Sequence, residues 1–168
     1  AEFDPKNAEI WYQRGELYFK QRKYSQSEKF LQKALDLDNH HYEAQNLIGK
    51  IAFQHGDDEK AQELWEKSLN DNEYDAYALA NLGNLHLEQE NYETAEKYLK
   101  QAFRLSPQNA NIWCFLGKYY YNQEQFGLAR TYLTTSQALN PENAELLTYL
   151  GLVFRDGGEV KRAEDAWK

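Results

Sequence analysis

Apolar residues recur at helical spacing along the whole chain, and the pattern returns every 34 residues. Leu79, Leu82 and Leu85, for example, lie three residues apart and share one face of a predicted helix. No segment alternates apolar and polar residues in the way a strand does. Short polar turns separate two such helices within each period, at 21–23, 55–57, 89–91 and 123–125. The pattern therefore predicts an all-α chain of repeated helix pairs.

Five glycines mark the same period: Gly15, Gly49, Gly83, Gly117 and Gly151. A glycine inside a helix costs about 1 kcal/mol relative to alanine, so five in phase need a shared packing reason. We expect each glycine, opposite a small residue of the paired helix, to let two helix backbones approach closely. The small residues are Ser27, Ala61, Ala95, Ala129 and Ala163.

The repeat resembles the tetratricopeptide repeat, whose pattern is W-x2-L-G-x2-Y, then A-x3-F, then P. The stretch 113–120 reads W-C-F-L-G-K-Y-Y and satisfies the first part of this pattern, and the prolines share one phase before a new repeat. Departures such as Arg14 and Gln45 at apolar positions are scattered singly. The resemblance covers essentially the whole chain and implies a right-handed superhelical solenoid.

By this period the repeats span 8–41, 42–75, 76–109 and 110–143, with a partial fifth over 144–168. Residues 1–7 are interpreted as the tail of a preceding repeat or as added residues. The chain stops at Trp167-Lys168, in the middle of an expected second helix. We therefore expect a piece of a longer protein, whose uncovered apolar ends favour end-to-end self-association.

Charge and hydropathy exclude some classes of partner. The chain has 27 acidic and 19 basic residues and a net charge of −8, which argues against a nucleic-acid ligand. No apolar run approaches the length that crosses a bilayer, so we expect no membrane insertion. The compartment is left open, with a soluble cytoplasmic protein favoured. One turn and the helix after it contain five acidic residues, which are interpreted as capping the start of that helix and forming its solvated face. They are Asp57, Asp58, Glu59, Glu63 and Glu66.

No group of residues suggests a reaction. His40-His41 falls between two repeats and is interpreted as a solvated loop pair, since Cys114 is far away and no ligand set has metal spacing. A single cysteine excludes an internal disulfide. The in-phase glycines lie inside helices and do not form a phosphate-binding loop. The sequence predicts no catalytic residue, no metal and no cofactor, and therefore a protein that is not an enzyme.

The resemblance implies that the first helix of each repeat lines a concave groove in which protein partners bind. Amide side chains there can pair with both the N–H and the C=O of an extended peptide. Aromatic side chains can hold apolar groups, and lysines can hold an acidic group of the ligand. The candidate groove residues are Tyr12, Asn46, Lys50, Asn81, Asn84, Phe115, Lys118 and Tyr149.

These observations predict a non-catalytic protein–protein interaction scaffold that binds a peptide or helical segment in its concave groove. Two alternatives stay open: the substrate-selecting arm of a larger enzyme, and an assembly factor for a pilus or secretion machine. The clamp with which some co-chaperones hold acidic chaperone tails lacks its basic residues here in every frame of the repeats, so that function is disfavoured.

Overall fold

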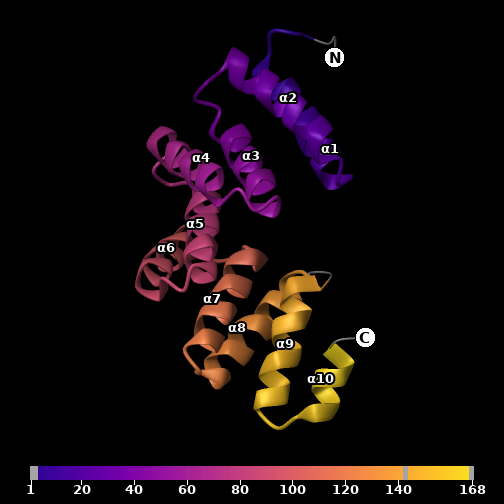
Figure 1. The fold of residues 1–168 in the computed structure, drawn as a ribbon, viewed down its shortest axis with the longest axis vertical. Coiled ribbons are helices and arrows are strands. Elements are labelled where there is room, and N and C mark those ends of the chain that lie inside the picture. The colour runs from indigo at the N-terminus through magenta and orange to yellow at the C-terminus, as the bar shows by residue number, and fades with distance from the viewer. Residues whose placement is uncertain (1–3, 142–143, 167–168) are drawn as a thin grey trace. The chain divides into compact units, whose positions relative to one another are not determined.

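The computed structural model describes residues 4–141 and 144–166, which form ten helices and no strand (Figure 1). The helices follow one another in pairs joined by short turns, which confirms the predicted all-α fold of helix–turn–helix units. Their bounds are α1 Ala8–Lys20, α2 Tyr24–Leu37, α3 Tyr42–Gln54, α4 Asp58–Asp71, α5 Ala76–Glu88, α6 Tyr92–Leu105, α7 Ala110–Asn122, α8 Phe126–Leu139, α9 Ala144–Asp156 and α10 Val160–Ala166.

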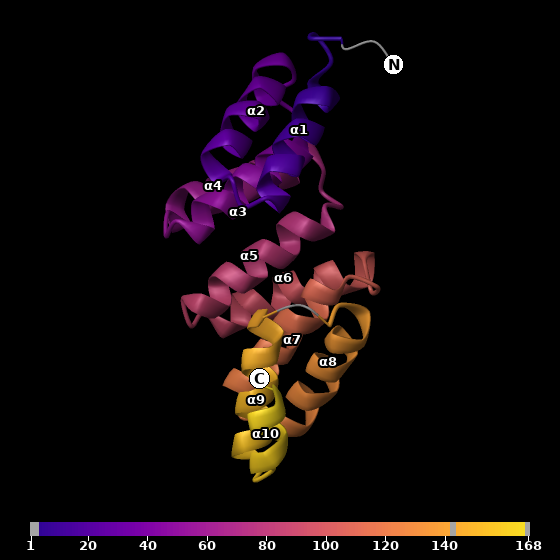
Figure 2. The same cartoon turned by 90° about the vertical axis from the view of Figure 1, so that its right-hand side faces the viewer.

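The chain divides into two compact units, Ala1–Asn81 and Leu82–Lys168, called here the N-terminal and C-terminal units. The division falls inside α5. In the N-terminal unit α1 packs on α2, α2 on α3 and α3 on α4. In the C-terminal unit the same order of packing continues from α6 to α10 (Figure 2). From α1 to α4 and from α6 to α10, each helix therefore contacts its neighbours in sequence, as expected of stacked repeats.

Each unit has a core made by the apolar faces of its own helices. Burial of such faces, at about 25 cal/mol for each Å² removed from water, is the main force that holds paired helices together. In the N-terminal unit the core contains Leu31, Ala34, Ala44, Ile48 and Ile51. In the C-terminal unit one cluster contains Cys114, Ala129, Leu133, Leu146, Leu150, Val153, Phe154 and Ala163.

Close helix approach explains the in-phase glycines. A Cβ atom added to Gly83 would lie 2.7 Å from Leu99 Cδ2, and one added to Gly117 would lie 2.5 Å from Leu133 Cγ. Real Cβ atoms essentially never approach other atoms so closely. The expected close approach is confirmed at these sites, but the residue in the way is a leucine 16 positions later. The small residues that were expected opposite these glycines, Ala95 and Ala129, lie 12 positions after the glycine instead.

The five turns inside the helix pairs share one backbone geometry. A residue with positive φ occurs every 34 positions: Arg22, Gly56, Glu90, Glu124 and Gly158. In the first turn the N–H of this residue bonds to the carbonyl of Phe19 at 2.8 Å, and the next N–H bonds to that of Tyr18 at 3.0 Å. This pair of bonds is the Schellman motif, which satisfies the last carbonyls of a helix. The polar turns predicted from the sequence are thus helix caps.

Two tryptophans tie a proline to the helix that follows it. The indole N–H of Trp11 donates to the carbonyl of Pro5 at 2.9 Å, and Trp113 does the same to Pro107 at 2.7 Å. The fixed spacing of these residues in the repeat therefore has a hydrogen-bonding cause. The expectations that concern residues 1–3, Trp167 and Lys168 lie outside the described residues.

Candidate functional site

Tyr12 on α1 is one of the candidate groove residues of the N-terminal unit, and its charged neighbours are acidic. Its ring is half-buried and lies 5.0 Å from the ring of His41. Burial, with the nearby charges of Glu16 and Glu43, raises the pKa of Tyr12 to about 12. The phenol therefore stays neutral near pH 7 and can donate a hydrogen bond. His41 was expected in a solvated loop, but it is buried, because α1 packs over the start of α3.

Asn46 on α3 is buried and bonded within the protein. Its Nδ2 donates to the carboxylate of Asp75, which also accepts from Ser68 Oγ at 2.7 Å. Asp75 further accepts from the backbone N–H groups of Tyr77, at 2.9 Å, and of Ala78, at 3.2 Å, and so caps α5. The amide donor of Asn46 is thus used to hold α3 near the start of α5. Its Oδ1 is buried and has no hydrogen-bond partner among the described residues.

Two further candidates of the N-terminal unit keep part of their surface exposed. The ammonium of Lys50 lies 5.5 Å from the centre of the Phe19 ring, within the range of a cation–π contact. Asn81 on α5 is partly exposed. Asn46 and Asn84 belong to different units and are each bonded inside their own unit. The expectation that the groove amides Asn46, Asn81 and Asn84 pair with a bound peptide therefore stays a prediction.

Lys118 on α7 is the centre of a polar cluster in the C-terminal unit. The residue is 1% exposed, and its ammonium donates to Asn84 Oδ1 at 2.8 Å, Glu88 Oε1 at 2.7 Å and Glu145 Oε1 at 2.5 Å. An ammonium has three N–H donors, so this geometry uses them all. Burial acts to lower the pKa of Lys118, but Glu145 and Glu88 outweigh it and hold that pKa above its ordinary value.

The surface of this cluster is aromatic and acidic. The rings of Phe115 and Tyr149 lie 5.8 and 5.3 Å from the ammonium of Lys118, and both rings are partly exposed. Glu88 and Glu145 are 49% and 43% exposed, so two accessible carboxylates accompany one buried ammonium. The expectation that Lys118 holds an acidic group of a ligand does not fit this arrangement, because its charge is already neutralised.

The structure thus brings Asn84, Phe115, Lys118 and Tyr149 together, and adds residues that the sequence did not single out. Asp75 directly precedes α5, and an acidic residue just before a predicted helix start is a recognisable cap signal. Glu145 lies in the first turn of α9, where a carboxylate is ordinary, and only its contact with Lys118 reveals its role.

Two features of the described residues concern metal binding and membrane insertion. These residues contain no group of three or more histidine, cysteine, aspartate or glutamate side chains that could hold a metal ion. Within the same part of the chain, no helix combines the length and the apolar character needed to cross a membrane.

Comparison with protein families identifies the repeats. Family models described as tetratricopeptide repeat match residues 8–41, 43–108 and 86–149. No curated protein matches the sequence.

Solved structures share the fold at low sequence identity. PilF of Pseudomonas aeruginosa is 22% identical, with a TM-score of 0.74 over 95% of this chain and 72% of its own. A protein described as a thermophilic TPR protein in Thermus thermophilus is 16% identical, with a TM-score of 0.81 over 95% of this chain and 87% of its own. PilW, described as a type IV pilus biogenesis factor, is 23% identical, with a TM-score of 0.74 over 97% of this chain and 76% of its own.

At these identities the solved structures show the fold alone, whereas the family models identify the repeats in the sequence itself. The helix pairs, the in-phase glycines and the family matches agree along nearly the whole chain. The chain belongs to the tetratricopeptide repeat family, whose repeats form protein-interaction scaffolds that are generally non-catalytic.

Proposed function

We propose that the first helices of the repeats bind an extended or helical segment of a partner protein. In the N-terminal unit the proposed contact residues are Tyr12, Asn46, Lys50 and Asn81. In the C-terminal unit they are Asn84, Phe115, Lys118 and Tyr149. Three of these residues, Asn46, Asn84 and Lys118, are buried. Their main role is to position the exposed residues, and they make little direct contact with the partner.

The observation that carries this proposal is the surface over Lys118. Phe115 and Tyr149 are aromatic side chains on first helices that keep part of their area exposed. The ring of Tyr149 also packs edge-on against Tyr121, at 5.7 Å, which restricts its orientation. Rigid, partly exposed aromatic rings are frequent anchors of protein interfaces, since they bury a large area at little cost in entropy.

Charge indicates the chemistry of the partner's contact residues. In the C-terminal unit Glu88 and Glu145 outnumber the single Lys118. Around Tyr12 in the N-terminal unit stand Glu9, Glu16 and Glu43, with Glu16 paired to Lys20 at 2.9 Å. Both surfaces therefore favour apolar or aromatic partner side chains with basic neighbours over acidic ones.

Selection from a random peptide library, with this chain as the bait, tests the proposal. Enriched peptides are expected to lose about tenfold or more in affinity for Phe115→Ala or Tyr149→Ala, which corresponds to about 1.4 kcal/mol. Leu128→Ala is the matched control, because this exposed apolar residue lies on the second helix α8. A selection in which no enriched peptide loses affinity for Phe115→Ala or Tyr149→Ala would contradict the proposal.

A second candidate function is assembly of a type IV pilus. It is supported by the likeness in fold to PilF and to PilW over nearly all of this chain. Deletion of the gene in its source organism should then abolish surface pili in electron micrographs, and return of the gene should restore them. A deletion strain with normal pili would rule this function out.

A further inference from the structure

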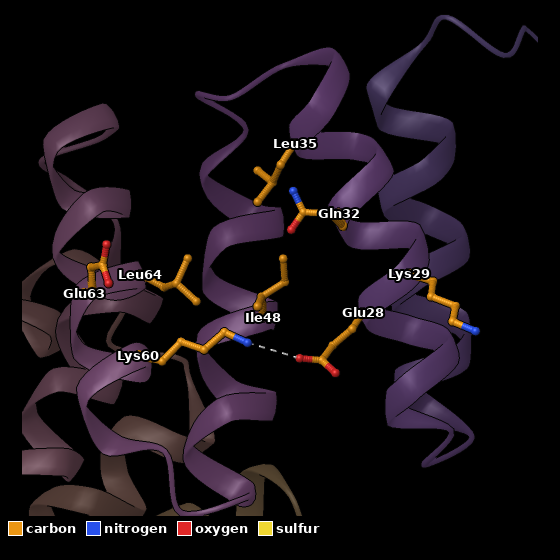
Figure 3. A pocket seen from close by; sticks show the side chains of 8 residues that line it. All are labelled: Glu28, Lys29, Gln32, Leu35, Ile48, Lys60, Glu63 and Leu64. Atoms are coloured by element: carbon orange, nitrogen blue, oxygen red, sulfur yellow. Dashed lines mark ion pairs between the residues drawn. The ribbon is translucent and has the colours of Figure 1, made fainter.

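A pocket in the N-terminal unit lies between the second helices of the first two repeats. It has a volume of about 400 Å³ and is lined from α2, α3 and α4. Leu35, Ile48 and Leu64 form its apolar walls, and Figure 3 shows these three side chains converging from separate helices. Ile48 belongs to the buried core, so the pocket opens directly onto the core of the unit. This surface is separate from the proposed contact residues, and the inference does not depend on the proposed function.

The repeats themselves show why this space is open. Two periods later, the positions of Leu35 and Leu64 hold Phe103 and Tyr132. These two rings lie 5.0 and 5.2 Å from the ring of Trp113, and Tyr132 also stacks on Tyr120 at 5.0 Å. The C-terminal unit thus fills the equivalent space with aromatic rings.

The N-terminal unit lacks all four of those rings. Gln45 and Ala52 stand at the positions of Trp113 and Tyr120, and leucines replace the other two. Gln45 is fully buried and turned to polar partners, donating to the Asn39 carbonyl at 2.8 Å and to Asp71 Oδ2 at 2.7 Å. The missing rings leave a space whose size and apolar walls suit an aromatic side chain from outside the chain.

The rim of the pocket carries two acidic and two basic side chains, Glu28 and Glu63 with Lys29 and Lys60. Glu28 and Lys60 form an ion pair at 3.5 Å across one end, as the dashed line in Figure 3 shows. Helix α4, which supplies Leu64 and Glu63, carries five acidic residues against two basic ones. Its carboxylates at Glu59, Glu63 and Glu66 are exposed. A segment that places an aromatic ring in the pocket and continues along α4 therefore meets more negative than positive charge.

We propose that this pocket binds an aromatic side chain of a partner protein, within a segment rich in lysine or arginine. The ring packs against Leu35, Ile48 and Leu64, and the basic residues pair with carboxylates of α4 such as Glu63. The apolar contact supplies affinity, and the complementary charges supply orientation and a faster encounter. The acidic helix, interpreted from sequence as a solvated face, is then one wall of an interaction surface.

Titration with synthetic peptides, followed by the methyl NMR signals of Leu35, Ile48 and Leu64, tests this proposal. The probe has one phenylalanine between two pairs of lysines in a glycine–serine background. It should give saturable shifts at these methyl groups. A peptide with alanine in place of phenylalanine, and one with glutamates in place of the lysines, should each bind at least about tenfold more weakly.

Two variants of the chain separate the parts of the proposal. Leu35→Phe with Leu64→Tyr fills the pocket with the rings that the C-terminal unit carries, and should weaken the lysine–phenylalanine peptide about tenfold or more while the protein stays folded. Leu37→Phe, on the exposed side of α2, is the matched control and should bind normally. Glu63→Lys keeps the pocket open and should weaken the peptide several-fold.

Several results would overturn the proposal. Absence of saturable shifts would do so, and so would equal affinity of the filled variant and the unchanged chain. Equal binding of the alanine peptide would show that charge alone acts, and equal binding of the glutamate peptide would show that the charge of α4 has no role.

Discussion

The ammonium of Lys118 has exchanged water for three protein oxygens, and this exchange stabilises the C-terminal unit only while all three bonds are kept. Replacing Lys118 by methionine keeps the buried stem and removes the charge. Glu88 and Glu145 are about half exposed and can be rehydrated, so the loss should stay near 1–3 kcal/mol in the free energy of unfolding at pH 7. Urea unfolding measures it, and Lys97→Met, in an exposed ion pair, should change little.

The contribution of Lys118 also depends on pH in a defined direction. The folded pKa lies above the ordinary value of about 10.4, so the stabilisation is fully present below that pH and is lost as the pH rises through the folded pKa. The difference in unfolding free energy between the unchanged chain and Lys118→Met should therefore shrink above about pH 10.4. The measurement compares the two proteins because both contain the other ionisable groups beside this position, which are Tyr149, Cys114, Glu88 and Glu145. A difference that grows above that pH would contradict this assignment.

Alanine substitutions should separate packed glycines from exposed ones. Gly127→Ala should stabilise the protein by roughly 0.5–1 kcal/mol, because nothing lies within 4 Å of the added methyl group and alanine favours the helix. Gly83→Ala should destabilise it, by about 1–3 kcal/mol, since the methyl group meets Leu99 at 2.7 Å and its backbone nitrogen at 3.3 Å. Melting temperatures that shift in the same direction for both variants would show that helix propensity alone, and not contact with Leu99, determines the change in stability.

For single residues, the sequence predicted which face of a helix a side chain occupies better than which residue it bonds to. Asn84 and Lys118 stand one residue after successive in-phase glycines, so the period alone places them on equivalent faces. The bond from Lys118 to Glu145 spans 27 residues and exists because α7 packs on α9. No local sequence pattern predicts this packing. The same holds for Asn46 and Asp75, 29 residues apart. His41 was misplaced because its burial depends on contact with α1, at residues far earlier in the sequence such as Tyr12.

At the scale of elements, the turns carry a strain that the sequence only partly relieves. Arg22, Glu90 and Glu124 each have a φ of 58°, where a side chain is disfavoured, whereas Gly56 and Gly158 hold the equivalent positions without this cost. The sequence predicted where the turns lie, because polar residues interrupt the apolar pattern. It did not predict the left-handed residue, since only two of the five positions are glycine.

Glycine at a strained cap should therefore stabilise the protein. Glu90→Gly relieves the left-handed conformation and should raise the free energy of unfolding by up to about 1 kcal/mol in urea. Gly56→Ala makes the opposite change at the equivalent turn, and should lower it although nothing lies within 4 Å of the added methyl group. A loss of stability in Glu90→Gly would mean that the entropy of the unfolded chain outweighs the strain.

For the whole molecule, the 34-residue period was sufficient to predict the helix pairs and the family, and both are confirmed. Periodicity predicts what the repeats share, and the distinctive surfaces lie where they differ. The pocket beside α4 is lined by Leu35 and Leu64, at positions where the C-terminal unit has Phe103 and Tyr132. Such differences are visible in the sequence, but their effect depends on how neighbouring helices pack.

The central claim is that the first helices of the repeats are the surface that binds a partner segment. Hydrogen exchange of this chain, with and without a peptide selected from the library, tests it most directly. The expected result is slower exchange in α7 and α9, around Phe115 and Tyr149, with the second helix α8 unchanged. Binding that leaves α1, α3, α7 and α9 unchanged and slows exchange only in second helices would contradict the claim.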